Sequence, residues 1–341
     1  MKSWAASGNA AQASRNALQS KGLLFLFVAW LVCFDIQLGA KLHKLSSNQT
    51  KTNNLPIFQK TSTFAKNFPV KKYKTAIILF LVFEVIAVSL WLTTGSLFYL
   101  LNFSYIGCSL GIGLALSAAG WKYARELIQF CVGAYMLVFL GLICRENMQI
   151  EGFWYYLFSG VLGAGTLHYA IAKMFGPLLF GRGWCGYCCW TAMILDLLPH
   201  KTPASPRKNM GWIRYVMFGL SLALVVLLMC LGKANKTSMF YLFVAGNVLY
   251  YAVGIILALA LKDNRAFCKY ICPITVFLKP MSHFSALRIH CDEAKCIHCG
   301  KCLEVCPMDV EVNNDSRNRK NATECILCQK CKKACPVNAL K

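Results

Sequence analysis

Apolar runs long enough to cross a lipid bilayer recur along this chain and limit its fold more than any other feature. A helix needs about 20 consecutive apolar residues to span the hydrocarbon core. Runs of that length occupy residues 75–95, 97–119, 124–144, 153–176, 212–232 and 239–261. Charged residues make up only 15% of the chain, against about 25% in soluble domains. The pattern predicts an all-α, multi-span membrane domain of six helices within residues 75–284.

Residues 1–74 are predicted to form a separate N-terminal segment with one candidate span. The run 22–39 is long enough to cross a bilayer, but Asp35 lies toward its end. It could be a membrane helix or an uncleaved signal-like anchor. Residues 41–74 carry eight lysines and no acidic residue, which predicts a basic cytoplasmic linker.

The net charge of +22 sets the expected orientation of the chain. Such an excess is also found in nucleic-acid-binding proteins, but no nucleic-acid motif is present, so nucleic acid is not expected as a partner. In membrane proteins, basic residues accumulate on the cytoplasmic side. With six spans, the strongly basic segments fall on one side: 41–74, 120–125, 177–211 and 262–341. We therefore expect a multi-pass protein of the inner or plasma membrane, in contact with lipid, whose C-terminal residues are cytoplasmic.

The C-terminal residues 285–341 contain the same cysteine pattern twice. Both copies have the spacing C-x2-C-x2-C-x3-C-P, and every cysteine of the second lies 29 residues after its counterpart. The first copy contains Cys296, Cys299, Cys302 and Cys306, and the second contains Cys325, Cys328, Cys331 and Cys335. A fixed offset of this kind marks an internal repeat.

This spacing is typical of two [4Fe–4S] clusters. Three thiolates two residues apart bind one cubane, and the fourth cysteine reaches the cluster of the other repeat. One predicted ligand set is Cys296, Cys299, Cys302 and Cys335. The other is Cys325, Cys328, Cys331 and Cys306. Structural zinc or disulfides are the alternatives, but zinc sites usually combine two separated pairs of ligands.

Residues 285–341 resemble the two-cluster bacterial ferredoxins. That resemblance implies a small α+β domain built from two similar halves. The segments 286–290 (ALRIH) and 309–313 (DVEVN) alternate in polarity, as short strands do.

Two further cysteine pairs lie between the apolar runs. The stretch GRGWCGYCCW contains Cys185 and Cys189, and FCKYICP contains Cys268 and Cys272. Both pairs are C-x3-C, and both fall on the cytoplasmic edge of the predicted topology. Four thiolates can hold a third iron–sulfur cluster or another metal, and structural thiols are the alternative. Cys188 could also replace Cys189 as a ligand.

These motifs together resemble the membrane polyferredoxins of the NapH, NosR and MauN type over residues 75–341. The matching positions are Trp184, Cys185, Gly186, Cys189, Cys268, Cys272 and Pro273, together with the two-cluster module. The departures are Tyr187 for tryptophan, Trp190 for proline and the additional Cys188. The resemblance implies electron transfer between a membrane carrier (quinol or quinone) or a flavoprotein and a redox partner protein.

We therefore expect an electron-transfer subunit of an oxidoreductase complex rather than an independent enzyme. Two alternatives remain open from the sequence. The protein could assist metal or cofactor assembly of a membrane enzyme, since Cys188 and Cys189 suit a soft metal. It could instead belong to a redox-driven ion pump, with Glu84 inside a predicted span as the acid. No nucleotide-binding fingerprint is present.

Overall fold

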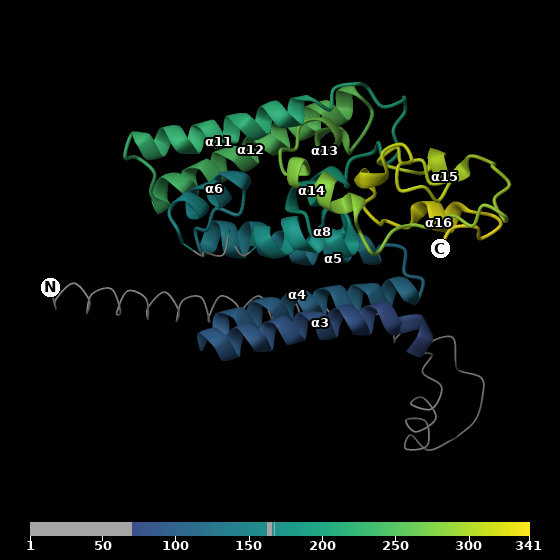
Figure 1. Ribbon diagram of the computed structural model, residues 1–341, viewed down its shortest axis with the longest axis horizontal. Helices are drawn as coiled ribbons and strands as arrows, with labels where there is room; N and C mark the ends of the chain where they lie inside the picture. Colours follow the sequence, from purple (N-terminus) through teal and green to yellow (C-terminus); the bar gives the residue numbers. More distant parts are fainter. Residues whose placement is uncertain (1–69, 162–165, 167) are drawn as a thin grey trace, which may run out of the picture. The chain divides into compact units, whose positions relative to one another are not determined.

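The structure, a computed structural model, describes residues 70–161, 166 and 168–341, and these are mostly helical (Figure 1). The predicted run 22–39 and nearly all of the predicted segment 1–74 lie outside the described residues. Backbone contacts divide the chain into two compact units that meet between Ala124 and Arg125. Each unit is described separately below.

The first unit contains a helical hairpin of α3 (Val70–Thr94) and α4 (Leu97–Ala118), which pack along each other (Figure 1). Gly95, with a φ of +68°, forms the tight connection. Gly107 of α4 lies so close to Phe83 of α3 that an added Cβ would approach the Phe83 Cβ to 2.8 Å. Small residues of this kind allow apolar helices to pack closely in a membrane, where dispersion contacts replace the hydrophobic effect.

Helices of the second unit form an apolar body. Helix α5 (Ala124–Ala134) continues into the π-helix η1 (Tyr135–Ile143), and both α11 (Ile213–Cys230) and α12 (Lys236–Ala260) pack against α6 (Ile150–Phe158). Leu220 of α11 and Val248 of α12 are 57% and 65% exposed, among many other apolar side chains that face outward. A continuous exposed apolar surface of this kind suits lipid.

Five helices of the described residues are long and apolar enough to cross a membrane. They are Lys72–Thr94, Leu97–Ala118, Ala124–Ile143, Ile213–Cys230 and Lys236–Ala260. The remaining predicted run, 153–176, contains α6 and the π-helix η2 (Tyr169–Phe175). Residues 162–165 and 167 between these helices are not described. The helical character of the membrane part is thus confirmed, and the sixth span stays a prediction.

Short helices carry the two C-x3-C motifs, one set between η2 and α11 and the other after α12. They are α8 (Gly176–Phe180), α9 (Gly183–Tyr187), α10 (Trp190–Leu195), α13 (Ala266–Tyr270) and α14 (Thr275–His283). In each motif the first cysteine lies inside a five-residue helix and the second follows that helix. The two motifs therefore adopt the same local structure.

Residues 285–341, which we call the ferredoxin module, contain only α15 (Lys301–Glu304), the 3-10 helix η3 (Ala322–Glu324) and α16 (Lys330–Ala334) (Figure 1). Within the described residues, the module has no strand beyond a single antiparallel bridge between Cys291 and Leu340. The expected strands at 286–290 and 309–313 are not formed as strands there, so the α+β class stays unconfirmed. The module packs in the same unit as residues 125–284.

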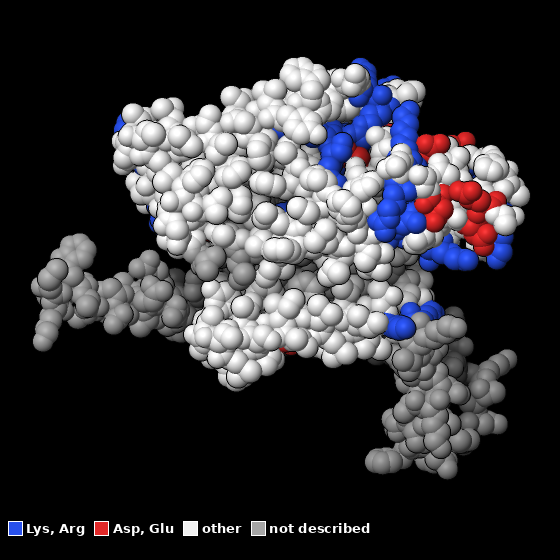
Figure 2. All heavy atoms as spheres, in the orientation of Figure 1, with Lys and Arg blue, Asp and Glu red and all other residues white. Residues whose placement is uncertain are grey.

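Charged residues are concentrated at one end of the second unit. In Figure 2, Lys and Arg side chains gather where the ferredoxin module meets the short helices, whereas the long helices show an almost uncharged surface. This distribution separates an apolar part that suits lipid from a polar part that suits water.

Candidate functional site

The two cysteine repeats of the ferredoxin module share one backbone conformation. Residues with positive φ recur at the 29-residue offset of the cysteines, in the pairs His298 and Leu327, Gly300 and Gln329, and Asp309 and Asn338. A left-handed conformation costs a non-glycine residue roughly 1–2 kcal/mol. Such residues persist only where the surroundings determine the conformation. The repeat in sequence is therefore a repeat in structure.

The fourth cysteine of each repeat is held by an equivalent hydrogen bond. The amide of Val310 donates to Cys306 Sγ over 3.4 Å, and the amide of Ala339 donates to Cys335 Sγ over 3.3 Å. Hydrogen bonds to sulfur stabilise the thiolate form and tune iron–sulfur potentials. The two sulfurs therefore accept backbone hydrogen bonds at corresponding positions of the two repeats.

Most of the predicted ferredoxin ligands contribute to one core. Cys306 and Cys331 are buried members of that core, and the partly buried Cys296, Cys302, Cys325, Cys328 and Cys335 pack against it. Cys299 is exposed. Burial raises the pKa of Cys325 to about 11 and of Cys331 to about 12. Because burial disfavours a bare thiolate, these side chains suit a cationic metal partner.

All four cysteines of the C-x3-C motifs line a single cavity with about 600 Å³ of empty space. Cys185 and Cys189 reach it from the first motif, and Cys268 and Cys272 from the second. Cys188 is buried but is not part of the lining. In the described part of the chain, no three His, Cys, Asp or Glu side chains already stand close enough to hold a metal ion. Binding of a metal ion or cluster in this cavity would require the four sulfurs to move closer together.

Two buried arginines link the C-x3-C motifs reciprocally. Arg182 precedes Cys185 by three residues, and Arg265 precedes Cys268 by three residues, with the same 83-residue offset as the cysteines. Arg182 donates to the carbonyl oxygen of Cys268 over 3.4 Å, and Arg265 donates to the carbonyl oxygen of Cys185 over 3.1 Å. The sequence analysis missed both arginines. The repeated pattern R-x2-C-x3-C is the signal that could have found them.

Positive charge surrounds this cavity. Lys173 and Arg182 are part of its lining, and the Arg182 Nε is buried without a hydrogen-bond partner among the described residues. Burial by itself would raise the pKa of the Cys185 thiol, but Arg182, Lys173 and Arg265 together lower it. Arg265 is fixed by Asp196, whose two carboxylate oxygens accept from its Nε and a terminal nitrogen over 2.7 and 2.5 Å. The cavity therefore favours an anionic occupant.

The first C-x3-C motif packs directly on the second cysteine repeat of the ferredoxin module. Gly186 lies so close to the Ile326 carbonyl oxygen that any added Cβ would collide with it. The Tyr187 hydroxyl donates to the carbonyl oxygen of Leu327 over 3.0 Å. Ile326 and Leu327 lie between Cys325 and Cys328 in the chain. Cys185 and Cys325 accordingly contribute to the same hydrophobic core.

A buried carboxylate ties the same two parts together. Glu324 is fully buried, and it pairs with Arg182, with Arg214 at 2.9 Å and with Arg207 at 3.1 Å. Lys279 lies 3.5 Å away. Buried charges are tolerated when they are paired and hydrogen-bonded, and removing one partner is then strongly destabilising. We call Glu324 and its three arginines the Glu324 cluster.

The second C-x3-C motif has its own ionic link to the module. Lys269, which is fully buried, bridges Asp263 at 2.7 Å and Asp309 at 2.6 Å. Asp309 follows the first cysteine repeat. Each of the C-x3-C motifs is therefore attached to a different repeat of the ferredoxin module.

Two family models match the chain at these motifs. A model described as a 4Fe–4S dicluster domain matches residues 288–337, which contain both cysteine repeats. A model described as a 4Fe–4S binding domain matches residues 166–202 and 246–290, which contain the two C-x3-C motifs. No solved structure is significantly similar.

Several known proteins are similar to parts of this chain at low sequence identity. The methylamine utilization ferredoxin-type protein MauN of Methylobacillus flagellatus is 27% identical over 230 residues, which cover 58% of this chain and 79% of MauN. The uncharacterized protein MJ0749 of Methanocaldococcus jannaschii is 28% identical over 165 residues, 45% of this chain and 63% of MJ0749. The putative electron transport protein YccM of Escherichia coli is 32% identical over 68 residues, 20% of this chain and 19% of YccM.

The motifs, the family models and the ferredoxin-type relatives together define an iron–sulfur electron-transfer protein that binds [4Fe–4S] clusters. More narrowly, the chain is a polyferredoxin-type 4Fe–4S protein, as its resemblance in sequence implied. Its apolar helices associate it with a membrane.

Proposed function

We propose that this protein relays electrons between a membrane carrier and a redox partner protein through three [4Fe–4S] clusters. The eight cysteines of the ferredoxin module hold two of them: one by Cys296, Cys299, Cys302 and Cys335, the other by Cys325, Cys328, Cys331 and Cys306. The third is held by Cys185, Cys189, Cys268 and Cys272. A bound [4Fe–4S] cluster supplies reversible one-electron chemistry.

One observation carries the proposal of a third cluster: all four C-x3-C cysteines line a single cavity with cationic walls. A [4Fe–4S] core with four thiolates is anionic, and Lys173 and Arg182 in the lining supply the opposite charge. A zinc ion with four thiolates would be anionic as well, so the cations alone do not distinguish the two. The match of residues 166–202 and 246–290 to a 4Fe–4S binding domain favours the iron–sulfur cofactor.

The order of the clusters follows from the packing. Because Gly186 and Tyr187 contact Ile326 and Leu327, the C-x3-C cluster is a neighbour of the cluster that includes Cys325. The Glu324 cluster keeps these parts together. Electrons would pass from the membrane edge to the second repeat, then to the first, or in the opposite direction.

A membrane quinol or quinone, or a flavoprotein, is the carrier we propose at the membrane edge, and the ferredoxin module is proposed to face the cytoplasm. The basic segments beside the C-x3-C motifs support this orientation by the positive-inside rule. Lys301, Lys330 and Lys333 lie close to the cysteine repeats, and they suit an acidic redox partner.

The two alternative functions have no supporting observation. The Cys188 thiol is buried outside the cavity that Cys189 lines, so the two thiols do not face a common site for a soft metal. For the ion-pump alternative, the candidate acid Glu84 accepts a hydrogen bond from Ser104 over 2.8 Å within the first unit.

Iron analysis of anaerobically purified protein tests the proposal. The wild type is expected to contain about twelve iron atoms per chain, and Cys185→Ala about eight, because one four-iron cluster is lost. Cys188→Ala is the matched control and should keep all of them. Equal iron contents in wild type and Cys185→Ala would contradict the assignment of the third cluster.

A further inference from the structure

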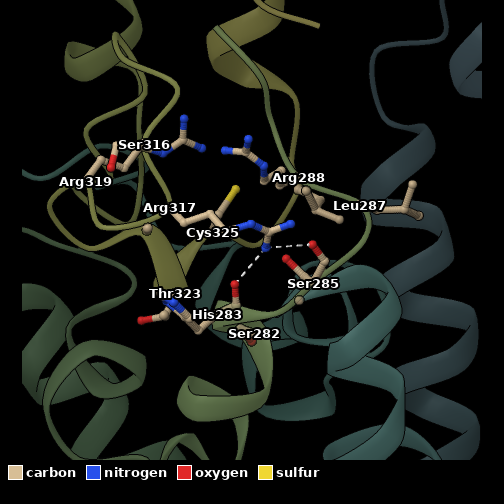
Figure 3. Close-up of a pocket in the computed structure, with 13 residues that line it drawn as sticks. Ser282, His283, Ser285, Leu287, Arg288, Ser316, Arg317, Arg319, Thr323 and Cys325 are labelled. Atoms are coloured by element: carbon tan, nitrogen blue, oxygen red, sulfur yellow. Dashed lines mark hydrogen bonds between the residues drawn. The ribbon is translucent and has the colours of Figure 1, made fainter.

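A second pocket of the same unit contains three arginines. It lies between the ferredoxin module and the end of α14, with about 400 Å³ of empty space (Figure 3). Arg288, Arg317 and Arg319 line it, together with the hydroxyl-bearing Ser282, Ser285, Ser316 and Thr323. None of its lining residues is acidic.

Backbone carbonyl oxygens hold two of the three guanidinium groups, those of Arg317 and Arg319, in place. Arg317 donates to the carbonyl oxygens of His283 and Ser285 over 2.8 and 3.2 Å, as the dashed lines of Figure 3 mark. Arg319 donates to the carbonyl oxygens of Asn314 and Ile289 over 2.7 and 2.8 Å. These bonds use terminal nitrogens and neutral acceptors, so they fix the groups without neutralising their charge.

Two donors in this pocket have no acceptor. The Nε atoms of Arg288 and Arg319 are both buried and have no hydrogen-bond partner among the described residues. A buried donor without a partner costs about 1–3 kcal/mol, and more for a charged group. Only 7% of Arg319 is exposed, so water reaches it poorly. An anion that reaches these nitrogens would satisfy both donors.

Like charges also crowd here. Burial is the main cause that lowers the pKa of Arg319, and the neighbouring Arg288 lowers it further. Asp315 pairs with Arg288 at 2.9 Å, and it is a single carboxylate beside three guanidinium groups. The protein's own side chains therefore give this pocket a net positive charge, before a cluster at Cys325 is counted.

We propose that this pocket binds a phosphate group. Three guanidinium groups, with serine and threonine side chains in the same lining, match the several acceptor oxygens of a tetrahedral phosphate. The group could belong to free phosphate or to an anionic phospholipid. Leu287, in the lining of the pocket, is 52% exposed, and Phe284, next to the lining residues His283 and Ser285 in the chain, is 69% exposed; such apolar side chains suit a lipid.

The pocket also adjoins a proposed cluster. Cys325 is part of its lining, and its side chain is surrounded by Arg288, Arg317 and Arg319 in Figure 3. This part of the inference rests on the proposed role of Cys325 as a cluster ligand. A phosphate bound here would add negative charge beside that cluster and would lower its reduction potential.

Phosphorus-31 hyperfine spectroscopy tests the site. Full-length, iron-loaded protein in a phosphorus-free maltoside detergent is reduced and supplied with inorganic phosphate or with phosphatidylglycerol. A phosphorus coupling to a reduced cluster is expected with at least one of them. Coupling with phosphate identifies a small anion, and coupling with phosphatidylglycerol alone identifies a lipid headgroup. Absence of coupling from both samples, with the cluster signal present, would overturn the inference.

Variants make the test specific to the pocket. Arg288→Gln and Arg317→Gln should weaken binding at least about tenfold, since each removes a charge-assisted donor. Lys320→Gln, an exposed lysine outside the pocket, should leave binding unchanged. Coupling that persists unchanged in both arginine variants would also overturn the inference.

Cluster loss and pocket failure remain distinguishable. Iron content and the reduced-cluster signal are measured first, because their absence contradicts the proposed function and not the pocket. Equilibrium dialysis with radioactive phosphate then measures binding without any cluster signal, and no saturable binding in the wild type would refute the site.

Discussion

Replacing Glu324 by glutamine should loosen the attachment between the C-x3-C motifs and the ferredoxin module. The side chain is fully buried, and Arg182 and Arg214 are each only 1% exposed, so the change leaves buried cations without a counterion. Removing one partner of a buried pair costs about 3–5 kcal/mol. At about 1.4 kcal/mol per tenfold change, local opening should become roughly 10²- to 4 × 10³-fold more frequent.

Hydrogen exchange measured by mass spectrometry is the assay. The amides of Cys185 and Cys188 donate to the carbonyl oxygens of Arg182 and Trp184 over 2.9 Å, and their exchange reports opening of this region. Glu304→Gln, an exposed carboxylate, is the control and should change exchange little.

The excess of cations around Glu324 gives a second, sharper expectation. Arg207→Gln should perturb exchange much less than Glu324→Gln, because it removes a surplus cation and leaves two arginines on the carboxylate. Equal effects of the two substitutions, or unchanged exchange in Glu324→Gln, would refute this account of the Glu324 cluster.

Further substitutions test the other parts of the site. Arg265→Gln should lower the iron content by about four atoms per chain while the ferredoxin signals persist, because Arg265 holds Cys185 in position; an unchanged iron content would contradict this role. Gly186→Ala should destabilise the second unit by about 1–3 kcal/mol or more through overpacking, since its methyl group meets the Ile326 carbonyl; thermal unfolding measures it, and Gly219→Ala, at a position with open space around it, is the control. Cys306→Ala should alter the electron paramagnetic resonance signal of the cluster that includes Cys325, and an unaltered signal would exclude the proposed exchange of ligands between repeats. A reporter fused after Lys341 should be active in the cytoplasm, and activity only on the opposite side would reverse the orientation.

The helices and the paired motifs could be predicted from the sequence because both depend on local spacing. Apolar runs near 20 residues predict helices whatever their neighbours, and α3, α4, α11 and α12 lie where those runs lie. Cysteine spacing reflects the geometry of the cofactor. The 29-residue repeat therefore reappears in the backbone, where Leu327 has a positive φ as His298 does.

The expected strands are not formed, because an alternation of polar and apolar residues indicates which face of a segment is buried. It does not specify another segment with which the backbone can form hydrogen bonds. The backbone of Glu311 does donate to the Lys320 carbonyl oxygen over 3.0 Å, and the bridge at Cys291 pairs with the end of the chain, but neither extends into a ladder. The β propensity of such short segments is decided by their context.

Long-range charge pairing was beyond the reach of sequence patterns. Glu324 lies next to a cysteine and 142 residues from Arg182, and nothing local distinguishes it from an ordinary surface carboxylate. These parts meet only in the folded chain, for example where Gly186 packs against Ile326. The pocket at Arg288 and Arg319 was missed for the same reason, since its residues come from separate turns.

Mössbauer spectroscopy of anaerobically prepared, iron-57-enriched protein tests the central claim most directly. The account predicts that all bound iron belongs to [4Fe–4S] clusters, at about three per chain, and that stepwise reduction and reoxidation interconvert their spectra reversibly. Protein that is correctly folded but contains zinc or paired disulfides at the cysteine repeats, or iron that does not respond to reductant, would contradict it.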